Sequence, residues 1–183
     1  MFSFSRKLSI LGLCLAGLMS AQTAAFKVGF RVSTVGGVRT ALWYPTNSTP
    51  VSHYYLGANF TGTVAPSSVP GTGTTRFPLV VFSHGNGSCG IQSIFFTEEL
   101  ARRGFVVAAP DHKDATCGSD GSFGSVGGVL QAPYFNPYAW TDETYVDRKS
   151  DVTAVVNALL ADAQFAPVID AQRIGISGPS LGG

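Results

Sequence analysis

The amino-acid sequence predicts a domain of the α/β class, in which a mostly parallel sheet begins with an antiparallel hairpin. Three short apolar runs, over residues 79–83, 105–109 and 173–177, are the main observation. Apolar runs without alternation are typical of parallel strands that are covered on both faces. A helical pattern follows each of the first two runs, which gives the strand–helix–strand order of a parallel crossover.

The hairpin is predicted over residues 26–33 and 38–44, which are rich in Val, Phe, Tyr and Trp. Gly36 and Gly37 lie between these runs, and paired glycines accept the positive φ angles of a tight turn. Residues 45–78 are dominated by Thr, Ser, Gly and Pro, with Tyr and Phe interleaved. That composition predicts a long surface loop.

Two helices are predicted from apolar residues that recur at helical spacing. The first covers residues 94–103 and ends at Gly104. Its expected core-facing residues are Phe95, Phe96, Leu100 and Ala101. The second helix is expected to start from an N-cap at Thr141 and to end near residue 163. Its apolar stripe consists of Val152, Val155, Val156, Leu159 and Leu160.

Length and charge indicate one domain without a nucleic-acid partner. The chain has 183 residues, of which 45% are apolar and 13% are charged. This is enough material for one sizeable core. The 12 basic and 11 acidic residues give a net charge of +1 and form no basic stripe. A nucleic-acid-binding surface is therefore not expected.

The first 25 residues have the pattern of a cleaved secretory signal. Arg6 and Lys7 precede an apolar run over residues 8–18, and small or polar residues follow. The run is about half of the ~20 residues that a membrane-spanning helix needs. We therefore expect a signal peptide over 1–25, a mature domain over 26–183, and a secreted or periplasmic protein. A cut after Ala21 and an uncleaved hydrophobic anchor are the alternatives.

Removal of the signal leaves two cysteines, Cys89 and Cys117. In an exported protein this pair is compatible with one disulfide, and two free thiols are the alternative. His53, His84 and His112 are scattered and lack the spacing of metal ligands. Neither a metal nor a cofactor is expected.

Ser180 is the strongest candidate for a catalytic residue. It lies in the pattern Gly178-x-Ser180-x-Gly182, directly after the third predicted strand. This is the nucleophile-elbow pattern, in which small flanking residues allow a sharp strand-to-helix turn that exposes the serine hydroxyl. An ordinary glycine-rich turn is the alternative.

The sequence His-Gly-Asn-Gly at residues 84–87, after the first buried strand, supports this interpretation. Acyl transfer needs two backbone N–H groups aimed at the developing oxyanion. We expect one from Leu181, directly after the serine, and the other from Asn86, with Gly87 as the alternative. His84 is expected to tie down the loop by hydrogen bonds rather than to act as the catalytic base.

Phe-Ser-His-Gly at residues 82–85 and the elbow segment 174–183 resemble the α/β-hydrolase fold. The chain from Phe26 onward is similar to the platelet-activating-factor acetylhydrolase and dienelactone-hydrolase-like esterases. Further similar segments are Leu-Trp-Tyr-Pro at 42–45, Ala-Pro-Asp-His at 109–112, and Arg148-x-x-Asp151. The family usually has His where this chain has Pro179. Dienelactone hydrolases use a cysteine nucleophile, so Ser180 favours the esterase side.

The resemblance implies a secreted serine hydrolase that cleaves carboxylic esters through an acyl-serine intermediate. Its substrate would be a small-molecule or lipid-like ester, as for an acetylhydrolase or a lipase-like enzyme. The alternatives are a non-catalytic binding protein on the same scaffold and a peptide or polyester hydrolase.

In this fold the catalytic acid and His follow the serine along the chain, whereas only three residues follow Ser180 here. We therefore expect an N-terminal part of the domain, truncated just after the elbow and without its catalytic acid and base. Asp111 and His112 precede the serine and are expected to line the cleft. The 183-residue product by itself is expected to be poorly soluble and inactive.

Overall fold

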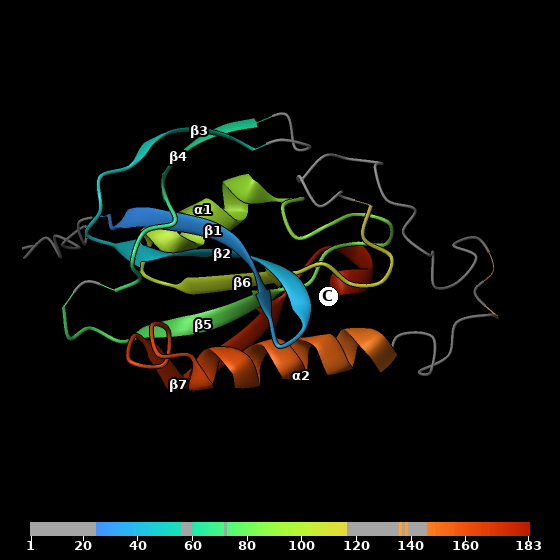
Figure 1. Ribbon diagram of the computed structural model, residues 1–183. Helices are drawn as coiled ribbons and strands as arrows, with labels where there is room; N and C mark the ends of the chain where they lie inside the picture. Colours follow the sequence, from blue (N-terminus) through green and yellow to red (C-terminus); the bar gives the residue numbers. More distant parts are fainter. Residues whose placement is uncertain (1–24, 56–59, 72, 117–135, 137, 139–145) are drawn as a thin grey trace, which may run out of the picture.

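The computed structural model describes residues 25–55, 60–71, 73–116, 136, 138 and 146–183. Seven strands form one sheet in the order β3-β4-β1-β2-β6-β5-β7 (Figure 1). The strands are β1 (Lys27–Val35), β2 (Val38–Thr46), β3 (Val51–Tyr55), β4 (Phe60–Pro66), β5 (Phe77–Phe82), β6 (Val106–Pro110) and β7 (Ile169–Ser177). Helix α1 (Ile94–Arg102) covers one face of the sheet, and α2 (Val146–Ala161) covers the other.

The predicted N-terminal hairpin is confirmed. Strands β1 and β2 pair in antiparallel register, with Val35 opposite Val38. The two turn residues between them, Gly36 and Gly37, have φ angles of +57° and +85°. This pair of positive φ angles matches the right-handed twist of the strands, and glycine adopts it without a Cβ penalty.

The three predicted apolar strands form the parallel part of the sheet. Strand β5 pairs in parallel with β6 on one side and with β7 on the other. Their carboxyl ends therefore meet at the same edge, which is where ligands bind in open α/β sheets. The segments 83–87, 111–116 and 178–183 all begin at that edge.

The prediction of a continuous loop over residues 45–78 is wrong, because this segment contains the β3–β4 hairpin and the start of β5. Its aromatic and β-branched residues favour strands despite the high content of Thr, Ser, Gly and Pro. A buried polar chain pins the hairpin to α1. Trp43 Nε1 donates to Tyr55 Oη at 2.9 Å, and Tyr55 Oη donates to Glu98 Oε1 at 2.8 Å.

The buried face of α1 differs from the predicted one. Phe95 is 69% exposed and Phe96 is 36% exposed, although both were expected to face the core. The buried positions instead follow an i, i+3, i+4, i+7 pattern: Ile94, Thr97, Glu98 and Ala101. A carboxylate occupies this face because the Tyr55 hydroxyl and Arg102 partner it. Apolar spacing by itself could not reveal those partners.

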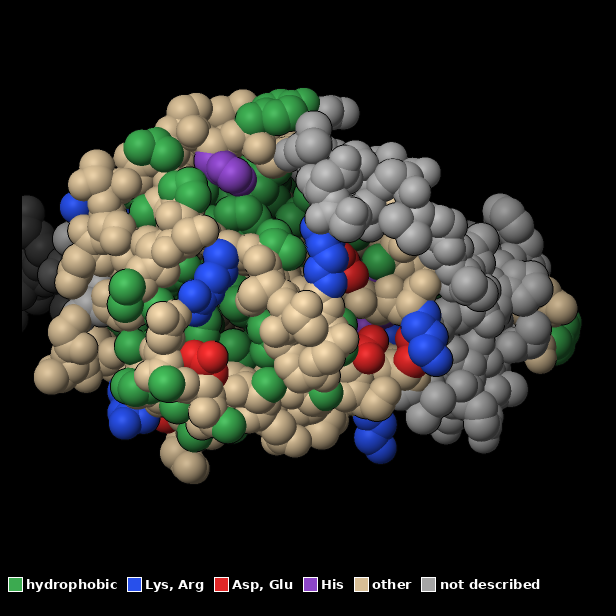
Figure 2. Space-filling model, in the orientation of Figure 1, with side chains coloured by type: hydrophobic (Ala, Val, Ile, Leu, Met, Phe, Trp, Pro, Cys, Tyr) green, Lys and Arg blue, Asp and Glu red, His purple; other side chains and the backbone are tan. Residues whose placement is uncertain are grey.

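Helix α2 packs on the opposite face as predicted, with Val155 and Leu159 buried in the core. The proposed N-cap Thr141 lies outside the described residues. Among the described residues, no helix is both long and apolar enough to cross a membrane. Figure 2 shows charged side chains of both signs scattered over one face of the molecule, among apolar and uncharged ones.

Strand β7 was predicted to be central in a complete sheet but to form an unpaired apolar edge in this chain, and it lies at the edge of the sheet. Within the described part of the chain it pairs with β5 only. Ile174 is 38% exposed and Ile176 is 64% exposed as a result. An exposed apolar edge strand is a template for pairing with another chain. The poor solubility of the 183-residue product stays a prediction.

We predict that Tyr55→Phe destabilises the domain by about 1–3 kcal/mol, because it leaves the Glu98 carboxylate and the Trp43 N–H without their shared partner. Urea unfolding followed by tryptophan fluorescence measures the change. Tyr138→Phe is the matched control, because Tyr138 is 95% exposed. Equal stability of the two variants would show that the polar chain does not hold the hairpin.

Candidate active site

Ser180 lies at a sharp turn directly after β7. Its φ angle is +53°, a conformation that non-glycine residues rarely adopt. Within the described residues only Ser67 shares a positive φ among the non-glycine residues. Ser180 is exposed and begins a short 3₁₀ helix over Ser180–Gly182. A strained, exposed serine after a parallel strand has the local geometry that the nucleophile-elbow pattern predicts.

The glycines on both sides of Ser180 are required by close backbone contact. A Cβ on Gly178 would lie 2.0 Å from the carbonyl oxygen of Ser83, and a Cβ on Gly182 would lie 1.9 Å from the same oxygen. A Cβ on Gly85 would lie 3.6 Å from the Pro179 carbonyl oxygen. The elbow therefore packs directly against the start of the His-Gly-Asn-Gly turn at residues 84–87.

The backbone N–H groups of this turn are not equivalent. The Gly85 N–H donates to Gln92 Oε1 at 2.9 Å, and the Gly87 N–H donates to Asp114 Oδ2 at 2.8 Å. No hydrogen bond among the described residues uses the N–H of Asn86. Gly87 is therefore occupied, and Asn86 keeps a donor available at the turn. Asn86 was the residue that the sequence favoured.

A buried arginine lies beneath the turn. Arg148, in the first turn of α2, donates from Nη1 to the His84 carbonyl oxygen at 2.6 Å and to Ser83 Oγ at 3.2 Å. Its Nη2 lies 2.8 and 2.7 Å from the two carboxylate oxygens of Asp114. The side chains of Arg148 and Asp114 are 8% and 0% exposed. A buried charge pair needs hydrogen-bond partners to offset its desolvation. Both Nη atoms of Arg148 have such partners, whereas its buried Nε has none among the described residues.

The structure also forms a Ser–His–Asp chain that the sequence analysis did not identify. Ser83 Oγ lies 3.1 Å from His112 Nε2, and His112 Nδ1 lies 2.9 Å from Asp151 Oδ2. Ser83 is 5% exposed, and the His112 side chain is 0% exposed. Two signals in the sequence point to this cluster: a His two residues after a strand, and the Arg148-x-x-Asp151 spacing that places both residues on one helix face.

Burial favours the neutral form of both histidines, His84 and His112. In neutral His112, Nδ1 donates to Asp151 and Nε2 accepts the Ser83 hydroxyl. His84 Nε2 accepts the backbone N–H of His112 at 3.1 Å, and its Nδ1 donates to the Gly85 carbonyl oxygen at 2.7 Å. His84 thus ties down the loop, as the sequence predicts. Burial lowers the pKa of His84 to about 4 and also lowers the pKa of His112.

The remaining predicted site residues have different outcomes. Leu181 is half-buried beside Ser180 in the 3₁₀ turn. The Asp111 carboxylate pairs with Arg39 and accepts the Gly90 N–H. His112 is buried in the Ser83 chain. Among the described residues, no hydrogen bond joins Ser180 Oγ to a histidine or a carboxylate, so its acid and base stay unassigned.

Cys89 is buried and takes part in a disulfide. Its predicted partner, Cys117, lies outside the described residues, so that pairing stays a prediction. The backbone N–H of Thr116 donates to the Ser88 carbonyl oxygen at 2.9 Å. This bond joins the segments that precede the two cysteines.

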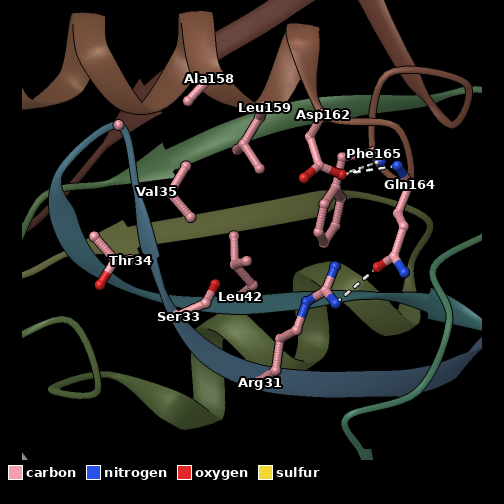
Figure 3. Close-up of a pocket in the computed structure, with 11 residues that line it drawn as sticks. Arg31, Ser33, Thr34, Val35, Leu42, Ala158, Leu159, Asp162, Gln164 and Phe165 are labelled. Carbon is pink, nitrogen blue, oxygen red and sulfur yellow. Dashed lines mark hydrogen bonds between the residues drawn. The ribbon is translucent and has the colours of Figure 1, made fainter.

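A separate pocket of about 270 Å³ lies between the β1–β2 hairpin and the end of α2 (Figure 3). Val35, Leu42 and Leu159 supply apolar wall. The Arg31 guanidinium donates to Gln164 Oε1 at 2.8 Å and lies 4.6 Å from the centre of the Phe165 ring. None of its lining residues belongs to the elbow or to the 84–87 turn, so it is not part of the Ser180 site.

The strand order, the crossover and the elbow after β7 define the chain as an α/β-hydrolase fold. Residues 41–121 match the family model described as platelet-activating factor acetylhydrolase, isoform II. The structure is similar to a ferulic acid esterase from Streptomyces cinnamoneus, with a TM-score of 0.62 and 21% identity over 89% of this chain and 54% of that chain. The predicted resemblance is therefore confirmed.

A Bacteroides fragilis protein provisionally named an acetyl xylan esterase matches with a TM-score of 0.40 and 18% identity, over 86% of this chain and 43% of that chain. The chain thus spans about half the length of these solved structures.

We predict that the free energy of unfolding falls as the pH is lowered from about 6.5 to about 4. Above this window His84 is neutral in both states; within it the unfolded chain binds a proton that the native His84 does not. Urea unfolding of the parent and of His84→Asn at several pH values tests this, with the steeper loss expected for the parent. Identical pH slopes for parent and His84→Asn would contradict the assignment.

Proposed function

We propose that this chain is the nucleophile-bearing part of a secreted serine hydrolase that cleaves carboxylic esters. The observation that carries the proposal is the contact between two features, the elbow that exposes Ser180 at positive φ and the turn that leaves the Asn86 N–H available. The matched family is named as acetylhydrolases, and the solved relative with the TM-score of 0.62 is named as a ferulic acid esterase. Both names denote enzymes that act on carboxylic esters.

In the proposed reaction, Ser180 Oγ attacks the ester carbonyl carbon while a base takes the hydroxyl proton. The backbone N–H groups of Asn86 and Leu181 bind the oxyanion of the tetrahedral intermediate. Collapse of the intermediate releases the alcohol and leaves an acyl-serine, which water then hydrolyses to the carboxylic acid. In this fold the base and its orienting acid are a histidine and an acidic residue that come after the nucleophile in chain order, and we propose the same roles for this protein.

The substrate class that we propose is a small-molecule or lipid-like ester. Tyr54 and Phe60, on the β3–β4 hairpin, are 53% and 43% exposed. These side chains lie at the edge of the sheet opposite β7, away from Ser180. The proposed substrate class therefore rests on the names of the matched family and of the solved esterase. Chain length and alcohol preference would be set by the walls of the acyl pocket.

The Ser83, His112 and Asp151 chain is a second candidate for the nucleophilic centre, because its distances match those of a catalytic triad. Access argues against it. Ser83 is buried, Arg148 donates to its hydroxyl oxygen, and its carbonyl oxygen lies against the elbow glycines. A substrate carbonyl has no approach to this hydroxyl, whereas Ser180 is exposed.

We predict that Ser180→Ala lowers ester-cleaving turnover of the complete protein by several orders of magnitude. The assay uses an acetyl ester with a chromogenic leaving group. In the parent, a fluorophosphonate probe should label Ser180, as located by mass spectrometry of the labelled peptide.

Ser83→Ala is the matched control, since it removes the other candidate hydroxyl. In this variant the probe should still label Ser180. The variant should be less stable than the parent but should keep most of its ester-cleaving turnover. Labelling at Ser83, or full turnover by Ser180→Ala, would refute the proposed nucleophile.

We further propose that residues 1–25 are removed on export. The start of the described domain supports a mature N-terminus at Phe26. Its backbone nitrogen donates to the Arg102 carbonyl oxygen at 2.8 Å, at the C-terminal end of α1, and its ring packs edge-on against Phe77 at 5.2 Å. A positively charged N-terminus at this position would be favoured by the dipole of α1.

We predict that the exported protein begins at Phe26. N-terminal sequencing of the secreted or periplasmic fraction, after expression in a secreting host, measures this. Deletion of residues 2–25 is the control and should keep the protein in the cytoplasm. A protein that retains Met1 and sediments with membranes would support an anchor instead, and one that begins at Gln22 would move the cut to Ala21.

A further inference from the structure

We propose that Arg148 and Asp114 are positioning residues for the oxyanion-binding turn. They hold residues 84–87 in the conformation that presents the Asn86 N–H to the substrate. The inference rests on the proposed function, because it assigns a role to the environment of the same site. It concerns side chains that do not touch the substrate and that neither the family match nor the fold identifies.

The side chains of Arg148 and Asp114 form hydrogen bonds with the turn on both sides of Asn86. Arg148 Nη1 donates to the carbonyl oxygen of His84, two residues before Asn86, at 2.6 Å. Asp114 Oδ2 accepts the N–H of Gly87, the residue after Asn86, at 2.8 Å. Because Arg148 Nη2 lies 2.7 Å from that same carboxylate oxygen, the two contacts form one continuous clamp.

The clamp determines which amide is left available. Gly87 has a φ angle of +63°, and its N–H is directed into the buried carboxylate of Asp114. The Asn86 N–H is thereby left as the unbonded donor between two occupied amides, among the described residues. Without Asp114, the Gly87 N–H would compete with the Asn86 N–H for the substrate oxyanion. The turn would also lose its fixed orientation.

Arg148 also links the turn to the elbow. It donates to Ser83 Oγ at 3.2 Å, while the carbonyl oxygen of Ser83 lies at the position where a Cβ of Gly178 or Gly182 would collide. One guanidinium therefore fixes both the turn that carries Asn86 and the backbone on which the Ser180 elbow rests. The Ser83, His112 and Asp151 chain orients the Ser83 hydroxyl as an acceptor for Arg148, which explains its triad-like geometry without a second nucleophile.

Loss of the clamp should affect kcat and KM differently. The oxyanion-binding N–H groups act on the tetrahedral intermediate far more than on the ground-state ester. Misplacing one of them by about 1 Å should therefore lower kcat by roughly 10- to 100-fold, while KM changes by less than about twofold. A residue that only stabilises the fold would lower the melting temperature and leave kcat of the folded enzyme unchanged.

The test compares Asp114→Asn and Arg148→Lys with the parent in the protein expressed from the complete reading frame. Asp114→Asn keeps the shape of the side chain but replaces one acceptor oxygen by a donor that faces the Arg148 guanidinium or the Gly87 N–H. Arg148→Lys keeps the charge but cannot contact both Asp114 and the His84 carbonyl oxygen with a planar fork. We expect lower kcat, similar KM and slower fluorophosphonate labelling of Ser180 in both.

Glu98→Gln is the matched control. Glu98 is a buried carboxylate on α1 that accepts from Tyr55 and pairs with Arg102, away from the turn. The Glu98→Gln variant should lose stability to an extent similar to that of the clamp variants and should retain the parent kcat. All variants are assayed at a temperature at which circular dichroism shows them folded, and Arg148→Lys provides the result if Asp114→Asn does not fold.

The outcomes separate the two proposals. If the parent is labelled at Ser180 and the folded clamp variants keep the parent kcat, the positioning role is wrong while the serine-esterase function stands. If the clamp variants lose kcat and Glu98→Gln does not, the role is supported. If the probe fails to label Ser180 in the parent, the proposed function itself fails, and the inference that rests on it fails with it.

Discussion

The contacts of one buried guanidinium, that of Arg148, join the parts of the molecule that form the candidate site. It lies at the start of α2 and contacts the segments that follow β5 and β6. A cation in this position has lost its hydration, and hydrogen-bond acceptors offset that loss. Asp114, the His84 carbonyl oxygen and the Ser83 hydroxyl supply those acceptors. The two segments that follow β5 and β6 are therefore held against the start of α2 at the carboxyl edge of the sheet.

Backbone packing imposes a second constraint at the same edge. The elbow after β7 approaches the segment after β5 so closely that Gly178 and Gly182 cannot carry a side chain. The glycines of the G-x-S-x-G pattern are thus required for two reasons. They allow the sharp turn at the serine, and they allow close contact between two loops. The Arg148–Asp114 pair and the small residues of the elbow together bring the turn that carries Asn86 against the segment that carries Ser180. This combination is what makes acyl transfer the reaction that the site supports best.

The Ser83, His112 and Asp151 chain shows that hydrogen-bond distances do not by themselves define a catalytic centre. The distances are those of a triad, yet the serine is buried and already accepts from an arginine. Ser180 has the reverse properties, since it is exposed and strained and has no acid–base partner among the described residues. Access and backbone conformation decide between the two serines.

The sequence by itself determined the parallel strands, the N-terminal hairpin and the glycine-flanked turn at Ser180, whereas the role of Asn86 as a donor stays a prediction. These depend on local patterns, namely apolar runs, paired glycines and small residues around a serine. Only the tertiary structure decided that Glu98 faces the core in place of Phe95, that residues 51–66 form a hairpin, and that Arg148 and Asp114 meet beneath the turn. Each of these depends on a partner far away in the chain, because a buried polar group is stable only where folding brings it a complementary one.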